Sequence, residues 1–308
     1  TPLKVIHYEG LVNTDPKRIA TVAKLKQMGE AATLMRYWQL TGDDRAARTL
    51  TDLILAWTRT YELRGNDVNE NKLYPLLGAY LALRDDFTPA DRKAVDAWVQ
   101  RLGELHLRAV SESDHFTNRY VKSVRLLAMA GMILGREAWV EKAEQGVKRF
   151  VRESLDADGT SEDLKRRDTL TYHGSALKKP LDLAIMLGEE GRALYAWQSP
   201  AGGSLKRSVD YVVPYAMGEK EHREWVNSQV DLDHRRAEAG LEKYRKGRLY
   251  EPRQALELME KAAYFDPDLM RVVRRLSESD AERFPTWQTL MNEAARPEPT
   301  VDDATDDR

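Results

Sequence analysis

Apolar side chains recur every three or four residues through most of the chain. The clearest series follows Thr14-Asp15-Pro16, where apolar positions from Ile19 to Trp38 fall on one helical face that Thr41-Gly42-Asp43 ends. A capping side chain before Pro is a typical helix start, because the N–H that Pro lacks would be unpaired in the first turn. Similar patterns predict further helices, near 50–61, 88–105, 118–134, 137–154, 174–187, 204–217, 231–246, 251–263, 267–277 and 280–294.

No stretch of the sequence alternates apolar and polar residues as a half-buried strand would. The β-prone run Tyr211-Val212-Val213 is short and ends at Pro214. The predicted fold class is therefore all-α, built from helix hairpins. Either an open solenoid of helix pairs or a ring of helix pairs, the (α/α) toroid, incomplete or closed, satisfies such a series. We predict one domain over residues 1–295 and a disordered acidic tail at 296–308.

Composition narrows the class of protein further. The 308 residues carry 48 Lys and Arg against 50 Asp and Glu, a net charge of −2, which does not indicate a nucleic-acid partner. No apolar run approaches the ~18 residues of a membrane span, so no membrane insertion is predicted. The chain has no Cys, which excludes disulfides and thiolate chemistry. No metal or cofactor is predicted: the His spacing fits no metal site, and the calcium-like Asp156-Ala157-Asp158-Gly159 has Arg167 where such a loop needs Glu.

Three polar segments interrupt the helical pattern and hold the candidate site residues. The first contains Asn69 and Glu70, which either cap a helix or offer an amide and a carboxylate to a substrate. The second, residues 115–125, begins a helix with Arg119 in its first turn. Positive charge there opposes the helix dipole, so the arrangement suits an anionic ligand, unless Arg119 and Arg125 pair with acidic neighbours.

The third segment is the most informative. Residues 156–161 form a turn, the basic triplet 165–167 follows, and Tyr172-His173 comes five residues after the triplet. Tyr and His can carry protons, and Arg can hold a carboxylate through two hydrogen bonds. An adjacent Tyr and His usually only pack. Their conjunction with the basic triplet nevertheless favours acid–base chemistry on an anionic substrate.

The three segments resemble the alginate-lyase-like family of polysaccharide lyases, which are (α/α) toroids. The strongest part runs from Asp158-Gly159-Thr160-Ser161 through Arg167-Asp168-Thr169-Leu170-Thr171-Tyr172-His173 to Pro180-Leu181. Weaker similarities follow the family's order over roughly residues 20–270, at Asn69-Glu70, Pro75-Leu76, Gly202-Gly203-Ser204-Leu205 and His222 with Glu224-Trp225. Thr117-Asn118-Arg119 stands where the best-known members carry Asn-Asn-His, which makes the chain more similar to the glucuronan-type branch.

The resemblance implies a lyase that cleaves a 4-linked uronate polymer, alginate or glucuronan, by β-elimination. Such an enzyme neutralises the carboxylate, removes the C5 proton and protonates the departing O4. In β-linked mannuronate or glucuronate H5 and O4 lie on the same side of the ring, so one group can serve both steps. The implied catalytic residues are Tyr172, His173, Asn118 and Arg167. The implied substrate-binding residues are Asn69, Glu70, His115, Arg119, Arg125, Lys165, Arg166 and His222.

Several roles stay open within this interpretation. Tyr172 would transfer the protons with help from His173 or His115, while Asn118 and one arginine would hold the carboxylate. A glycoside hydrolase on the same toroid or a non-catalytic helical-repeat protein that binds other proteins are the competing classes. The expected partner is an anionic polysaccharide, and the expected location is periplasmic or secreted, from the family and the missing initial Met.

Overall fold

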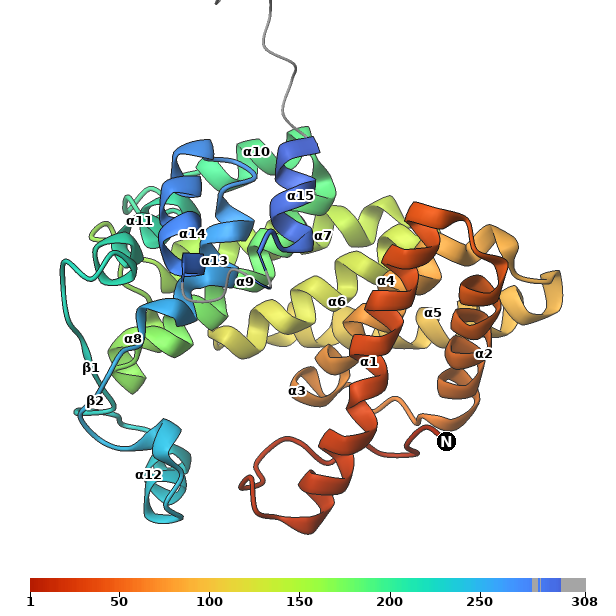
Figure 1. Cartoon of the computed structure of the whole chain (residues 1–308), viewed down its shortest axis with the longest axis horizontal. Helices are drawn as coiled ribbons and strands as arrows, with labels where there is room; N and C mark the ends of the chain where they lie inside the picture. The colour runs from red at the N-terminus through yellow and green to blue at the C-terminus, as the bar shows by residue number, and fades with distance from the viewer. Residues whose placement is uncertain (279–281, 283, 295–308) are drawn as a thin grey trace, which may run out of the picture.

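The computed structural model describes residues 1–278, 282 and 284–294, and helices make up most of this part (Figure 1). The helices of the N-terminal half are α1 (Pro16–Thr41), α2 (Asp44–Thr60), α3 (Asp67–Glu70), α4 (Tyr74–Leu83), α5 (Pro89–Glu112), α6 (Asn118–Leu134) and α7 (Glu137–Ser154). The later helices are α8 (Glu162–Arg167), α9 (Leu170–Leu187), α10 (Glu189–Ala196), α11 (Leu205–Ala216), α12 (Asp231–Glu238), α13 (Leu256–Ala262), α14 (Met270–Ser277) and α15 (Trp287–Ala294). Two-residue strands β1 (Arg223–Glu224) and β2 (Arg248–Leu249) pair antiparallel.

Short 3₁₀ turns join several of these helices: η1 (Asn71–Leu73), η2 (Arg84–Asp86), η3 (Glu242–Tyr244), η4 (Pro252–Ala255) and η5 (Pro267–Leu269). The all-α fold class predicted from the sequence is confirmed by this content. The predicted acidic tail at 296–308 lies outside the described residues. Within those residues, no helix is both long enough and apolar enough to cross a bilayer.

Local sequence signals set many of the helix ends. Asp15 caps α1 through hydrogen bonds to two backbone N–H groups, and Gly42 takes a left-handed conformation, with φ of 66°, after the last turn. Helices α6 and α7 occupy the predicted ranges and meet at Gly135, whose φ of 63° only Gly adopts without strain. In these helices the apolar spacing and the terminal signals agree.

Other predicted ends were wrong. Helix α9 starts at Leu170 instead of 174, because Thr169 caps it by accepting the N–H of Thr171 at 3.1 Å. Helix α12 ends at Glu238 instead of 246. Helix α15 starts at Trp287, and residues 280, 281 and 283 of its predicted range lie outside the described residues. The β-prone run 211–213 lies inside α11, and the short helices α8 and α10 were not predicted. The helix start that the sequence left open at Asn69-Glu70 lies in α3, where Asn66 is the capping residue, and α4 follows.

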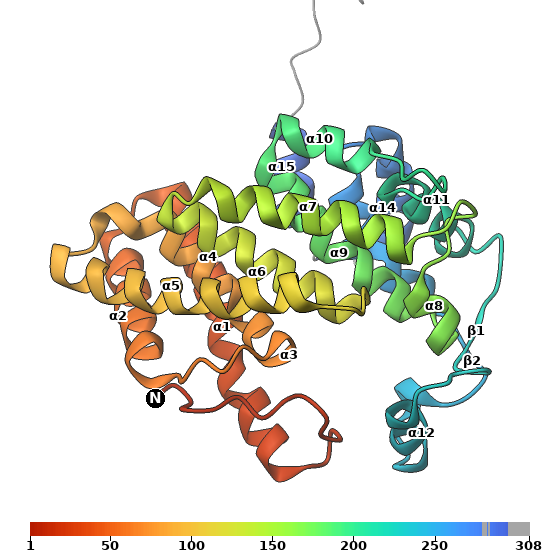
Figure 2. The same ribbon diagram turned by 180° about the vertical axis from the view of Figure 1, so that it is seen from behind.

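Helix α6 lies at the centre of the N-terminal half. It packs against α4, α5, α7 and α9, and Figure 2 shows α5, α6 and α7 side by side. Every α6 residue from Ser123 to Gly131 is buried. Helices α5 and α7 also approach closely, because a Cβ on Gly103 would lie 1.9 Å from the Trp139 ring. One cluster of buried apolar side chains runs from Ile6 to Leu276 and holds α6 and α9 in place.

Residues 218–250, which we call the arm, project from this helical body. The arm contains β1, α12, η3 and β2, and it extends on the same side of the molecule as the N-terminal loop, residues 1–15 (Figures 1 and 2). Its base is tied to the α8–α9 junction, where Trp225 N–H donates to the Asp168 carbonyl at 2.7 Å. Both residues have positive φ, 66° and 50°, which side-chain-bearing residues rarely adopt. The backbone is thus strained where the arm joins the α8–α9 connection, four residues before Tyr172.

Candidate active site

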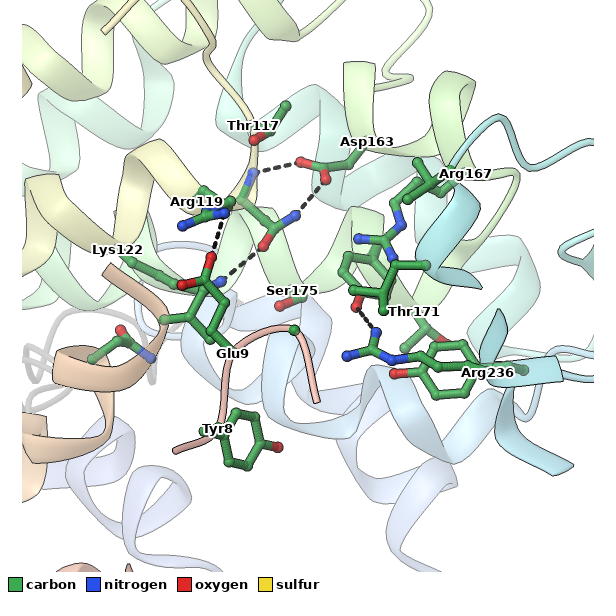
Figure 3. A pocket seen from close by; sticks show the side chains of 18 of the residues that line it. Tyr8, Glu9, Thr117, Arg119, Lys122, Asp163, Arg167, Thr171, Ser175 and Arg236 are labelled. Atoms are coloured by element: carbon green, nitrogen blue, oxygen red, sulfur yellow. Dashed lines mark hydrogen bonds and ion pairs between the residues drawn. The ribbon is translucent and has the colours of Figure 1, made fainter. Parts of the chain in front are cut away.

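A cleft of about 470 Å³ opens between the N-terminal loop, the start of α6, the α8–α9 segment and the arm (Figure 3). Two carboxylates of the described residues line it, Glu9 and Asp163. The basic side chains that line it are Arg18, Lys72, Arg119, Lys122, Arg166, Arg167, Lys179, Arg236 and Lys243. Within the described part of the chain, only Arg119 and Arg167 of these nine form ion pairs with carboxylates. A protein with a net charge of −2 therefore concentrates uncompensated positive charge in this cleft.

Tyr172 lies in the first turn of α9 between two arginines. The guanidinium of Arg167 stacks on its ring, 3.4 Å from the ring centre. Arg236, from the arm, donates from Nη1 to the Tyr172 hydroxyl at 3.4 Å (Figure 3). Trp225 packs edge-on against the same ring, with 5.7 Å between ring centres. These contacts direct the hydroxyl into the cleft and place positive charge beside any negative charge that develops on its oxygen.

Arg167 has its own fixed partner. Its Nε donates to Asp233 Oδ2 at 2.9 Å, and its Nη2 pairs with the other oxygen of the same carboxylate. Arg167 is therefore committed to Asp233 on one side and to the Tyr172 ring on the other. Arg166 is exposed and lines the cleft, and no described carboxylate pairs with it. Of the basic triplet, Arg166 has the guanidinium that is available to a ligand.

Asn118 is held at the start of α6 by a buried carboxylate. Asp163 accepts the Asn118 backbone N–H at 2.6 Å and its side-chain amide at 2.5 Å. This arrangement supplies the negative charge that the helix dipole favours at an N-terminus. Burial raises the pKa of Asp163. Lys122 donates to Asn118 Oδ1 at 2.9 Å, so the amide has one orientation and one hydrogen left for a ligand.

The other two cations of α6 are neutralised by the protein. Arg119 pairs with Asp67 and Glu9, and Arg125 pairs with Asp182. The structure thus shows the acidic pairing that the sequence left as an alternative. Arg119 still lines the cleft, whereas Arg125 does not.

His173 does not line the cleft, although it follows Tyr172 directly. It is fully buried, its Nε2–H donates to the Ser208 carbonyl at 3.0 Å, and the Ser161 hydroxyl donates to its Nδ1 at 2.7 Å. Burial lowers the pKa of His173 to about 4, so the ring is neutral at ordinary pH. Consecutive residues of a helix differ by 100° in direction, which turns His173 into the core and Tyr172 into the cleft. The described contacts make His173 a link between α9, α11 and the cap of α8.

The remaining predicted substrate-binding residues also lie outside the cleft lining. Glu70 is buried and bonded to His106 Nε2 at 2.9 Å. His115 is exposed, and Lys165 pairs with Asp156. His222 contacts the Asp168 carbonyl at 3.3 Å. Asn69 acts indirectly: its Oδ1 accepts two backbone N–H groups of the N-terminal loop, from Tyr8 and Glu9 at 3.2 and 3.0 Å.

Several cleft residues were not predicted from the sequence. Lys122 lies four residues after Asn118 and Lys179 seven after Tyr172, so helical spacing placed each on the face of a predicted residue. Tyr8 and Arg236 carried no comparable signal, because only the folded chain brings the N-terminal loop and the arm to this place. Among the described residues, no group of three or more His, Asp or Glu side chains is arranged to hold a metal ion.

The comparisons with known proteins agree with this fold. The family model described as alginate lyase matches residues 1–223, so the chain belongs to the alginate lyase family and is a polysaccharide lyase. An alginate lyase structure from Bacteroides ovatus is similar, with a TM-score of 0.64 and 18% identity over 87% of this chain and 74% of that one.

A second solved structure is a histidine-to-alanine variant of alginate lyase A1-III in complex with a tetrasaccharide. It gives a TM-score of 0.61 and 15% identity, over 86% of this chain and 76% of that chain. Both likenesses confirm the (α/α) toroid over the open solenoid. A sequence comparison with curated proteins finds no match.

Proposed function

We propose that the protein cleaves a 4-linked uronate polymer by β-elimination, with Tyr172 as the group that transfers protons. One observation carries this proposal: the Tyr172 hydroxyl is directed into a cleft most of whose cations pair with no described carboxylate, with one arginine on its ring and another at its oxygen. A polyanion supplies the negative charge that this cleft lacks. A phenol among cations suits the removal of a weakly acidic proton.

The carboxylate of the sugar must be neutralised before its C5 proton can leave. The Asn118 amide, fixed by Asp163, and the free guanidinium of Arg166 are the donors we assign to that carboxylate. Tyr172 then takes the C5 proton as its phenolate and returns a proton to the departing O4. Arg236 stabilises the phenolate oxygen before the transfer, and Arg167 stabilises it through the ring.

The two cleft carboxylates do not fit the competing hydrolysis. A glycoside hydrolase needs one carboxylic acid for the leaving group and a second carboxylate for water or the sugar. Glu9 is paired with Arg119, and Asp163 is bonded twice to Asn118. Both are committed to protein partners, which favours elimination.

A single proton-transfer residue indicates substrates in which H5 and O4 share a face, namely β-linked mannuronate or glucuronate. The test is the ultraviolet absorbance of the new double bond, measured with purified protein and four polymers: alginate, polymannuronate, polyguluronate and glucuronan. We expect absorbance to rise with polymannuronate or glucuronan and to stay lowest with polyguluronate. No rise with any of the four would contradict the proposal. A periplasmic or secreted location belongs to the same proposal.

A further inference from the structure

Arg119 follows Asn118 in the sequence, but carboxylates of the protein already pair with its guanidinium. Its Nε and Nη2 contact Asp67 at distances between 2.5 and 3.2 Å, and its Nη1 pairs with Glu9 at 2.5 Å. The fork of the guanidinium thus faces two protein carboxylates. A substrate carboxylate would have to displace one of them to bind Arg119 in the same way.

Lys122 lies about one turn further along α6 and, unlike Arg119, pairs with no described carboxylate. Its Nζ donates to Asn118 Oδ1 at 2.9 Å and points into the cleft (Figure 3). No carboxylate of the described residues lies within ion-pair distance of it. The charged groups that face it are Asp67, Asp163, Arg119 and Lys72, two of each sign. Desolvation lowers the pKa of Lys122 to about 8.

An ammonium that is half-buried and has no paired anion is unfavourable unless a ligand completes the site. Asn118 offers its remaining amide hydrogen from the same helical turn, and Asp163 prevents that amide from rotating. An anion that contacts both groups would lie between α6 and the Tyr172 side of the cleft.

We propose that Lys122, together with Asn118, binds and neutralises the carboxylate of the uronate unit whose C5 proton is removed. This inference rests on the proposed function and adds a residue to it. Arg119 then acts as a positioning residue that holds the N-terminal loop through Glu9. Arg166, which is exposed, is left to contact the same carboxylate from its other side or a neighbouring sugar.

If Lys122 binds the carboxylate, KM should depend on pH in a way that identifies this residue. The free enzyme loses the Lys122 charge as the pH rises through about 8, so substrate binding should weaken there. If the neutral amine does not bind the carboxylate, KM rises by up to about tenfold per pH unit above that value. An arginine at the position stays charged, so the rise should disappear.

The experiment compares wild type, Lys122→Met, Lys122→Arg and the control Lys148→Met on the polymer that the wild type cleaves best. Lys148 lies on α7 outside the cleft lining and carries the same charge. We expect Lys122→Met to lower kcat/KM by about 100-fold, the effect of losing one donor to a developing oxyanion. Lys122→Arg should stay within about tenfold and show a KM that does not change with pH near 8. The control should match wild type.

Unchanged kcat/KM in folded Lys122→Met, with wild type active, would overturn the inference and leave the proposed function intact. If wild type cleaves none of the four polymers, the proposed function fails instead. Calorimetry with a mannuronate tetrasaccharide then decides the inference separately. Binding that is about tenfold weaker for Lys122→Met supports the carboxylate site, since one charge-assisted hydrogen bond has that effect. Equal binding, or none by wild type, overturns it.

Discussion

The two walls of the cleft are held in place by different forces. One wall belongs to α6 and α9, which pack into the apolar core and whose first turns carry Asn118 and Tyr172 at the cleft. The other wall belongs to the arm. The buried residues of α12 are Asp233 and Arg236. Asp233 contacts Arg167 at the end of α8, and Arg236 contacts Tyr172 on the helix wall.

Apolar burial therefore fixes the helices that carry Asn118 and Tyr172, and charge pairing fixes the arm residues that contact Tyr172 and Arg167. Apolar packing in a dense core is stiff and hardly depends on pH or salt. Ion pairs and charged hydrogen bonds depend on both, and each can be removed by one substitution. We therefore expect changes in the helix wall to remove the reaction, and changes in the arm to weaken it.

Tyr172→Phe should have the largest effect, because it removes the proton-transfer group and keeps the ring. We expect kcat to fall by at least about 100-fold, the lower end of acid–base contributions. The melting temperature should hardly change, since one phenolic hydrogen bond contributes about 1 kcal/mol. Tyr264→Phe, outside the cleft lining, is the matched control. A folded Tyr172→Phe enzyme with more than about a tenth of wild-type kcat would exclude Tyr172 as the base.

Asn118→Ala should have the next largest effect. We expect kcat to fall by about 100-fold, as for the loss of one oxyanion donor. It also leaves the buried Asp163 carboxylate without its amide partner, which should cost about 1–3 kcal/mol of folding free energy. Steady-state kinetics and urea unfolding separate the two effects. Wild-type turnover in a variant that shows only the stability loss would make Asn118 a purely structural residue.

Arg236→Gln tests the arm and should have a smaller effect. The variant loses the charged hydrogen bond to the Tyr172 hydroxyl, and we expect kcat to fall about tenfold, equivalent to about 1.4 kcal/mol. Arg235→Gln removes the same charge from the exposed side of α12 and should leave kcat unchanged. Equal losses in both variants would point to overall charge instead of the contact with Tyr172.

His173→Gln should change stability more than turnover. The folded pKa of about 4 lies below the ~6.5 of an unfolded His, so the unfolded chain binds more protons between these values. Stability therefore falls as the pH falls from about 6.5 to about 4. Between pH 7 and pH 5, wild type should lose about 2 kcal/mol more than the variant in urea unfolding. A large loss of kcat in a stable variant would contradict this and indicate that His173 takes part in the reaction.

The sequence predicted α6 and α7 better than the arm, and the reason is physical. Apolar spacing and caps are local, so the ends of α6 and α7 could be predicted from residues within a few positions. The arm is fixed by contacts between residues more than fifty positions apart, such as Arg167 with Asp233, and such contacts have no local pattern.

The same limit applies to the choice among neighbouring residues. Tyr172 and His173 form one motif in the sequence, yet the helix directs one to the cleft and the other to the core. Arg166 and Arg167 differ likewise: one is exposed in the cleft and the other is bound to Asp233. Residue type indicated the chemistry, but the side chain's direction decided which residue is available for it.

The most direct test of the central claim is the fate of water in the reaction. Hydrolysis adds one water molecule to the products, whereas β-elimination adds none and leaves a double bond. We therefore propose digestion of polymannuronate or glucuronan in water enriched in heavy oxygen, followed by mass spectrometry of the oligosaccharides under conditions that prevent exchange at the reducing end. We expect products whose new non-reducing end is lighter by one water than a saturated end, with no heavy oxygen incorporated during cleavage. Saturated products that carry heavy oxygen would contradict it.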